Sequence, residues 1–303
     1  MNWYYGPAKY EILNDYERNL DEIMPLGWGI FGWINRYIFI PVFGFISALG
    51  IGYGIAIVLF TILVRIVMSP VTYKSYLSQA KMKVLRPEIT ELNEKFKDNP
   101  MKKQQETMKL YSKAGVNPMA GCLPALMQMP IFYALFQFFP SMFDLRQKSF
   151  LWADDLSSYD SIYQLPFHIP FYGSHVSLFP ILASIAIFFY MKMTTGDQAM
   201  STPPQEGMPD MGKIMKIMIY ISPVMMLFFF NNYASGLSLY YFISNLITIG
   251  IMLVIKNYIV KEDKIHAQIQ ENKTKEKKES KFQKKMREMM EQAEAQKAAQ
   301  KKK

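Results

Sequence analysis

The sequence has almost none of the side chains that build disulfides or zinc sites. It contains one cysteine and three histidines in 303 residues. Cys122 alone cannot close an internal disulfide, which excludes a disulfide-stapled secreted module. One cysteine and three histidines are also too few for a Cys/His zinc cluster. Neither GxxxxGK(S/T) nor HExxH occurs, so a phosphate-loop enzyme and a zincin protease lack their motifs.

Charge and apolar residues are present in quantity, but they lie in different places. The chain has 34 Lys+Arg against 25 Asp+Glu, a net charge of +9, and half of its residues are hydrophobic. Its mean hydropathy is nevertheless only +0.02. Residues 256–303 hold 15 Lys/Arg and 8 Asp/Glu, which is +7 of the net charge. The rest is an apolar chain with 22 Phe, 19 Tyr and 23 Met, too apolar to be disordered.

Five stretches are long and apolar enough to be membrane-spanning helices, since a helix needs about 20 mostly apolar residues to cross a bilayer. They are residues 50–70, 119–140, 176–193, 213–232 and 236–256. Pro124, Pro130 and Pro223 fall inside them, and neighbouring helices can satisfy the carbonyls that such prolines free. Five runs with no acidic residue disfavour the alternative, a soluble protein with long core helices. The predicted fold class is therefore an all-α polytopic membrane protein.

The aromatic stretch before the first span has a different character. Residues 26–48 contain two tryptophans and are interrupted by Asn35, Arg36 and Pro41. We predict an amphipathic helix that lies at the membrane surface, and a sixth span is the alternative. Residues 1–25 read as an extracytoplasmic remnant. The sequence does not begin with the basic segment and apolar run that form a signal peptide. We therefore expect an upstream membrane anchor to precede it.

The distribution of positive charge predicts the orientation. Residues 74–113 hold ten Lys/Arg, whereas residues 141–175 hold two against four acids and residues 1–49 hold three against five. The segment 74–115 and the tail 257–303 are therefore predicted to be cytoplasmic, and the N-terminus and the loop 141–175 to lie outside. The remaining loop, 194–212, is rich in Pro, Gly, Ser and Thr and reads as a flexible cytoplasmic connection.

The two cytoplasmic regions each allow two interpretations. Apolar residues at helical spacing, a break at Asp98-Asn99-Pro100 and a stop at Gly115 predict a helical hairpin over 74–115. It is either a plain connector or a docking platform, and long loops are more often functional. The tail 257–303 is predicted to be disordered or a fraying helix. It either binds anionic lipids or RNA through charge alone, with no sequence specificity, or only keeps the chain soluble.

Arg65 is the most informative single residue, because it lies inside the first span. An arginine at a helix centre costs about 2.5–3.5 kcal/mol and less near an end, so snorkelling to the cytoplasmic surface is one interpretation. The other is that Arg65 faces a water-filled cavity. Thr61, Gln128, Ser244 and Asn245 could line that cavity, although each alone is typical of a helix–helix hydrogen bond.

No catalytic set is apparent, and we predict that the protein is not an enzyme and needs no cofactor or metal. His168 and His175 fall in the external loop, where we expect surface positions. Cys122 has no neighbouring histidine and is expected to pack as a small hydrophobe. The serines in the spans have no evident base.

Several ordered motifs resemble one known family. They are Ser78-Gln79-Ala80-Lys81-Met82, Leu85-Arg86-Pro87, Asn117-Pro118-Met119-Ala120-Gly121-Cys122-Leu123-Pro124, Gln128-Met129-Pro130-Ile131-Phe132, and Ser235-Gly236-Leu237-Ser238-Leu239-Tyr240-Tyr241 with Ser244-Asn245-Leu246. Together they resemble the YidC/Oxa family of membrane protein insertases in its bacterial branch, over roughly Tyr4 to Lys256.

The resemblance implies a five-helix core, residues 49–256, around a hydrophilic groove open to the cytoplasm and to lipid. The family's intramembrane arginine corresponds to Arg65, its substrate-contact positions to Thr61, Phe132, Phe229 and Tyr241, and its polar groove position to Gln128. Asn245 completes the predicted site. One departure is Met191, where some members place a glutamine. Bacterial members usually carry an extra N-terminal helix and a large periplasmic domain, and we interpret Met1–Asp21 as the end of such a domain in a truncated chain.

The function implied is that of an insertase and chaperone in the bacterial inner membrane. It would move nascent membrane proteins from the cytoplasm into the bilayer, alone or with the Sec translocon, with the ribosome meeting the basic tail and hairpin and with anionic lipids nearby. A secondary transporter or channel is the alternative from another class. The lack of an inverted repeat and of an intramembrane acid disfavours it.

Overall fold

The computed structural model describes residues 4–16, 19–97, 100–116, 123–199, 211–259 and 262–274. The chain forms two compact units. The first comprises Met1–Thr72, Leu123–Gly196 and Met215–Leu253, and the second Tyr73–Cys122, Asp197–Ile214 and Val254–Lys303. The motif Asn117–Cys122, most of the 194–212 loop and the tail beyond Thr274 lie outside the described residues.

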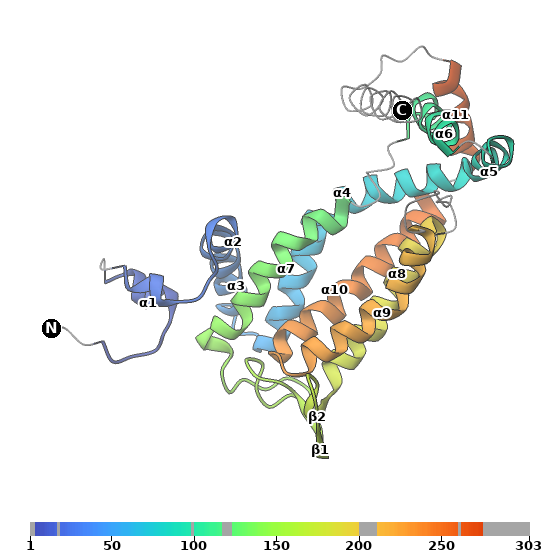
Figure 1. The fold of residues 1–303 in the computed structure, drawn as a ribbon. Coiled ribbons are helices and arrows are strands. Elements are labelled where there is room, and N and C mark those ends of the chain that lie inside the picture. The colour runs from blue at the N-terminus through green and yellow to red at the C-terminus, as the bar shows by residue number, and fades with distance from the viewer. Residues whose placement is uncertain are drawn as a thin grey trace, which may run out of the picture. The chain divides into compact units, whose positions relative to one another are not determined.

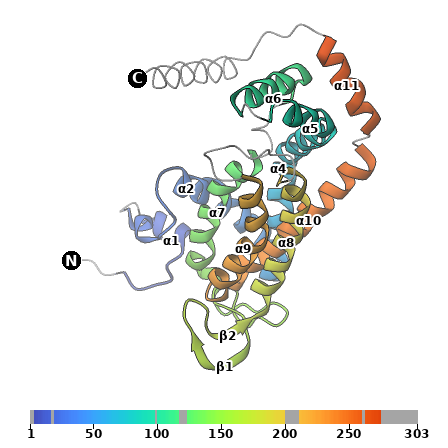
Figure 2. The same cartoon turned by 45° about the vertical axis from the view of Figure 1, so that its right-hand side comes forward.

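The first unit is built mainly from long apolar helices. Figures 1 and 2 show α7, α8, α9 and α10 running side by side. The elements that lie mainly in this unit are α1 (Tyr10–Asn14), η1 (Leu20–Ile23), α2 (Gly29–Ile34), the π-helical turn η2 (Asn35–Phe39), α3 (Ile40–Ser47), α4 (Tyr53–Val84), α7 (Leu123–Ser141), η4 (Phe143–Leu145), β1 (Ser161–Ile169), β2 (Gly173–Ser177), α8 (Leu178–Ala199), α9 (Met211–Asn231) and α10 (Ser235–Val254).

Four helical runs among the described residues are long and apolar enough to cross a membrane. They are Gly29–Ser47, Tyr53–Val84, Lys213–Asn231 and Ser235–Tyr258, and Leu178–Thr194 is a shorter apolar helix. The chain is thus a mostly helical, multi-pass protein, as predicted. Helix α4 differs from the predicted span 50–70, because it continues past Pro70 to Val84.

The run Gly29–Ser47, predicted as a surface helix, has the length of a span. It is held against α7 by Asn35, which is fully buried and donates from Nδ2 to the carbonyls of Leu26 (2.8 Å) and Ala134 (2.9 Å). The surface placement of this run stays a prediction, with the sixth span as its alternative. Gly32 allows the turn before it, since a Cβ there would lie 2.3 Å from the Gly27 carbonyl oxygen.

The core of the first unit consists of interlocking aromatic rings. Phe43, Phe60, Phe138, Phe139 and Tyr240 are all fully or almost fully buried. The Phe60 and Phe138 rings stack with centroids 6.0 Å apart, and Phe43 meets Phe138 edge-on at 5.6 Å. Such edge-on and offset pairs are the favoured aromatic geometries. These rings come from α3, α4, α7 and α10. One hydrophobic core therefore joins helices that are far apart in the sequence.

The segment 141–175, predicted to lie outside, contains structure that the sequence did not suggest. β1 and β2 form an antiparallel hairpin, with Ser161 opposite Ser177 and Ile169 opposite Gly173. A pure all-α description is therefore incomplete. The surface position expected for His175 is wrong as well. His175 is buried, stacks on Tyr159 at 3.9 Å and hydrogen-bonds the Asn231 carbonyl at 2.8 Å, because backbone groups at the end of α9 need partners.

The second unit contains α5 (Arg86–Lys95), α6 (Pro100–Ala114) and α11 (Glu262–Thr274). The helix stops at Lys95 and resumes at Pro100, either side of the predicted break. The start of the tail, predicted to be disordered or a fraying helix, is the helix α11, which packs on α5 and α6. Ile265 and Ile269, one turn apart on α11, are buried with Leu85, Ile89, Ala114 and Val116. The i,i+4 isoleucine pair supplies the apolar stripe that a polar helix needs for docking.

Candidate functional site

Arg65 is half-buried on α4 and points toward α10. Its guanidinium Nε donates a hydrogen bond to the hydroxyl of Ser244, which is fully buried. Among the described residues Arg65 forms no ion pair with a carboxylate, in keeping with spans that hold no acidic residue. A guanidinium has five N–H donors, so the bond to Ser244 leaves most of them for water or for an anion.

Further polar atoms are buried in the helices around Arg65. The Tyr240 hydroxyl lies beside Ser244, and the Gln128 amide lies beside the Tyr241 hydroxyl. The charge of Arg65 interacts electrostatically with Tyr190, Tyr240 and Tyr241. Three of these buried atoms have no hydrogen-bond partner of good geometry within the described part of the chain: Gln128 Nε2, Tyr240 Oη and Tyr241 Oη. Each would cost about 1–3 kcal/mol if it were dry. The interior near Arg65 therefore has the polarity that ordered water requires.

An aromatic cluster adjoins the polar atoms. The Phe132 ring lies 5.6 Å from that of Tyr241 and 6.5 Å from that of Phe229. Tyr241 is 5 % exposed and Phe229 is 44 % exposed, so the cluster runs from the interior to the surface of the first unit. Four of the predicted site residues, Gln128, Phe132, Phe229 and Tyr241, are thus neighbours.

Sequence reasoning missed two members of this cluster. The Phe136 ring lies 5.4 Å from that of Phe229 and 4.3 Å from that of Tyr233. Phe136 and Tyr233 follow Phe132 and Phe229 by four positions. Because residues four apart lie on one face of a helix, the spacing from Phe132 could have identified Phe136, whereas Tyr233 lies beyond the end of α9. Ser244, one of the polar residues that could line a cavity, lies outside the predicted set of site residues.

Thr61 and Asn245, the remaining predicted residues, are buried and bonded to their own helices. The Thr61 hydroxyl donates to the Ile57 carbonyl at 2.7 Å, and Asn245 Nδ2 donates to the Tyr241 carbonyl at 2.7 Å. In the described structure neither forms a hydrogen bond with Arg65. The Thr61 hydroxyl hydrogen and one Asn245 amide hydrogen are therefore already bonded within their own helices.

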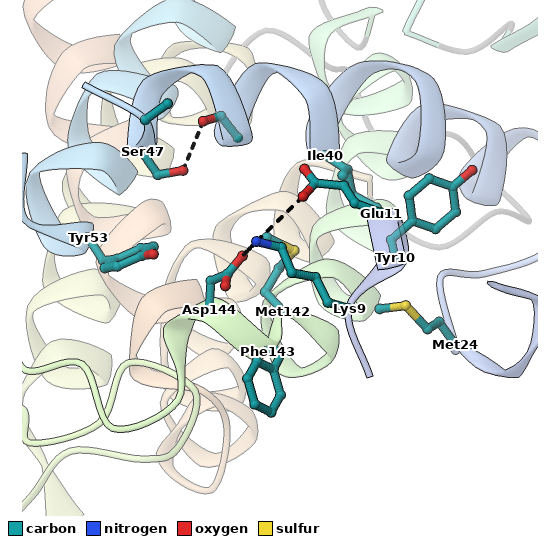
Figure 3. Close-up of a pocket in the computed structure, with 12 residues that line it drawn as sticks. Lys9, Tyr10, Glu11, Met24, Ile40, Ser47, Tyr53, Met142, Phe143 and Asp144 are labelled. Carbon is teal, nitrogen blue, oxygen red and sulfur yellow. Dashed lines mark hydrogen bonds and ion pairs between the residues drawn. The ribbon is translucent and has the colours of Figure 1, made fainter. Parts of the chain in front are cut away.

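A separate cavity lies at the end of the first unit where α4 begins. Its volume is about 320 Å³, and it is lined by none of the predicted site residues. Figure 3 shows Lys9 reaching between Glu11 (3.5 Å) and Asp144 (3.1 Å). Partial burial opposes the charged form of Lys9, but the two carboxylates outweigh it and raise its pKa. The Lys9–Asp144 ion pair thus links the N-terminal segment to η4, just after α7.

Comparison with known proteins adds an independent line of evidence. The family model described as 60Kd inner membrane protein matches residues 44–264. The membrane protein insertase YidC of Parabacteroides distasonis is 47 % identical over 289 residues, which cover 91 % of this chain and 44 % of that protein. The protein of the same name from Porphyromonas gingivalis is 42 % identical over 319 residues, covering 100 % of this chain and 50 % of its own length. The chain therefore spans about half the length of these curated relatives.

Proposed function

The chain belongs to the 60Kd inner membrane protein family, and on that premise we propose that it is a membrane protein insertase and chaperone of the bacterial inner membrane. The proposed substrates are nascent membrane proteins that pass from the cytoplasm into the bilayer. The observation that carries the proposal is Arg65 on α4, tied to Ser244 on α10 among buried polar atoms and beside an aromatic cluster that reaches the surface. The names of its relatives agree with this role.

The polar part of the site would lower the cost of moving a client's hydrophilic segment. Burying an unpaired amide or hydroxyl in hydrocarbon costs roughly 2–7 kcal/mol. A groove wetted by water around Gln128, Tyr240 and Tyr241 shortens the dry distance that such a segment must cross. The free N–H groups of Arg65 would attract the acidic residues of the client. Ser244 acts here as a positioning residue, since it holds one nitrogen of the guanidinium.

The aromatic part would guide the client's apolar segment into lipid. Phe132, Phe136 and Phe229 form a continuous ring surface that becomes exposed at Phe229. Aromatic faces accept varied apolar side chains without hydrogen-bond geometry, which suits a broad range of clients. Hydrophobic transfer of the client then supplies the driving force, and no nucleotide is needed.

The wider architecture is proposed on the same basis. It comprises five spans within residues 49–256 and the run 26–48 at the outer surface, with the N-terminus outside and the C-terminus in the cytoplasm. The Sec translocon, the ribosome and anionic lipids are proposed partners. Within the second unit, α11 packs on α5 and α6, which supports a shared basic surface of hairpin and tail for the ribosome.

Complementation of a strain depleted of its own insertase tests the role of Arg65. We expect Arg65→Ala to insert acidic-tailed clients poorly, and Arg65→Lys to retain activity if charge rather than guanidinium shape is needed. Arg146→Ala is the matched control, because it removes the same group from a loop residue packed on the Phe143 ring.

Normal insertion of acidic-tailed clients by Arg65→Ala, at equal protein levels, would contradict the electrostatic role. Uptake of a small solute by liposomes that hold this protein alone would support a transporter or channel in place of an insertase.

A further inference from the structure

The hairpin β1–β2 carries exposed aromatic side chains on an uncharged segment. Residues 161–177 contain no Asp, Glu, Lys or Arg. Tyr163 is 61 %, Phe167 60 % and Phe171 91 % exposed. None of these three rings stacks on another described ring, so they add little to folding. A water-facing hairpin would ordinarily carry charged residues on such edges.

The turn of the hairpin is fastened to the end of α9. Asn231, fully buried, donates from Nδ2 to the carbonyls of Tyr172 (2.8 Å) and His175 (2.9 Å) and accepts from the Ser177 N–H (3.0 Å). Asn232 donates to the Tyr172 carbonyl at 2.9 Å. Gly173 permits this approach, because its φ is +105° and a Cβ would lie 2.7 Å from the Asn232 side chain. The hairpin therefore has a set position at this end of the first unit (Figure 2).

This attachment holds the turn that carries Phe171 beside the end of α9, a helix with an exposed apolar face. Val224, Met225 and Phe228 are exposed on α9, a helix long and apolar enough to span the membrane. The Tyr172 ring meets the Phe228 ring with centroids 5.3 Å apart, and Phe171 directly precedes Tyr172 in the chain. Phe171 has φ +67°, a region that bulky residues rarely adopt and that glycine or asparagine would occupy with less strain. A strained and exposed aromatic residue at this place points to a role outside folding.

We propose that the hairpin is a lipid anchor, with Tyr163, Phe167 and Phe171 seated at headgroup depth in the outer leaflet. Aromatic side chains prefer that level of a bilayer. The strands cannot go deeper, because a two-stranded sheet leaves edge N–H and C=O groups that hydrocarbon does not satisfy. The proposal assumes that α9 spans the membrane, as in the proposed function.

Depth-dependent quenching tests the anchor in the full chain. A single cysteine that carries a nitrobenzoxadiazole label replaces Phe171 in a Cys122→Ser background, and the protein is reconstituted in phosphatidylcholine vesicles. Ile221→Cys, exposed near the middle of α9, is the deep reference, and Glu94→Cys, exposed on the polar helix α5, is the water reference. We expect headgroup-spin-labelled lipid to quench the Phe171 label at least about twofold more than the Glu94 label, and mid-chain-labelled lipid to quench the Ile221 label most.

The references separate failure of the anchor from failure of the proposed spans. Equal quenching of the labels at positions 171 and 94, with the label at position 221 quenched by mid-chain lipid, would overturn the anchor and leave α9 as a span. A label at Ile221 that mid-chain lipid does not quench would overturn both. Strongest quenching of Phe171 by mid-chain lipid would overturn the headgroup depth.

A second variant pair tests the chemistry of the contact. With the label at Tyr163, the change Phe167→Ser/Phe171→Ser should reduce headgroup quenching, whereas Phe167→Trp/Phe171→Trp should preserve it. If the serine pair quenches like the parent, the aromatic rings do not hold the hairpin at the lipid surface.

Discussion

At the scale of single residues, the Tyr241 hydroxyl reports whether the site is wet. It is buried close to the Gln128 amide, but no hydrogen bond of good geometry satisfies it in the described structure. A dry hydroxyl would cost about 1–3 kcal/mol, so its removal would stabilise the protein. If water fills the proposed groove, we expect Tyr241→Phe to change the free energy of unfolding by less than about 0.5 kcal/mol. Denaturant unfolding in detergent micelles measures this, and Tyr233→Phe, near the surface end of the cluster, is the control.

Asp160 is a second residue whose role is local and measurable. Its Oδ2 accepts from the Leu178 and Phe179 N–H groups and from Trp152 Nε1, at 2.8–2.9 Å, and so caps α8. We expect Asp160→Ala to lower the free energy of unfolding by about 1–2 kcal/mol, as loss of a helix cap does. Asp160→Asn preserves the accepting oxygen and should lose less.

The pH dependence of Asp160 follows from its burial. Burial raises the pKa of the carboxyl, and the hydrogen bonds from Phe179 and Trp152 only partly offset this. The folded chain therefore binds the proton at higher pH than the unfolded chain. Its contribution to stability is complete below the ordinary aspartate pKa and falls as the pH rises through the raised value. Thermal unfolding across the acidic range should show this slope in the parent and not in Asp160→Asn; an equal slope in both would contradict it.

At the scale of elements, α11 attaches the start of the tail to the hairpin α5–α6. Ile265 and Ile269 are almost fully buried there, and Asn272 donates to the Ala114 carbonyl at 3.3 Å. Truncating a buried isoleucine to alanine costs about 2–5 kcal/mol, more than a helix of this size gains from its few remaining contacts. We expect Ile265→Ala/Ile269→Ala to release α11, seen as faster hydrogen exchange over residues 262–274. Gln268→Ala, on the exposed face, should leave exchange unchanged.

At the scale of the whole molecule, the basic tail should govern attraction to polyanions. Residues 275–303 hold 11 Lys/Arg and 5 Asp/Glu. Their removal should weaken co-sedimentation with ribosomes and reduce its dependence on salt, because fewer counterions are released on binding. Deleting residues 289–296, which contain no Lys or Arg, is the matched control. Equal salt dependence in the full chain and the tail deletion would exclude the tail as the ribosome contact.

The sequence alone was enough for the mostly helical, multi-pass character and for the family, since each rests on local composition or on motif order. Arg65 as the centre of the site stays a prediction. The sequence could not predict that Arg65 bonds to Ser244, that Phe136 and Tyr233 join Phe132 and Phe229, or that His175 is buried under Asn231. Nor could it predict the hairpin at the end of α9 or the docking of α11. These depend on how each helix is rotated and where its ends meet other backbone groups. Residues far apart in the chain decide that through packing and hydrogen bonding, and hydropathy does not record it.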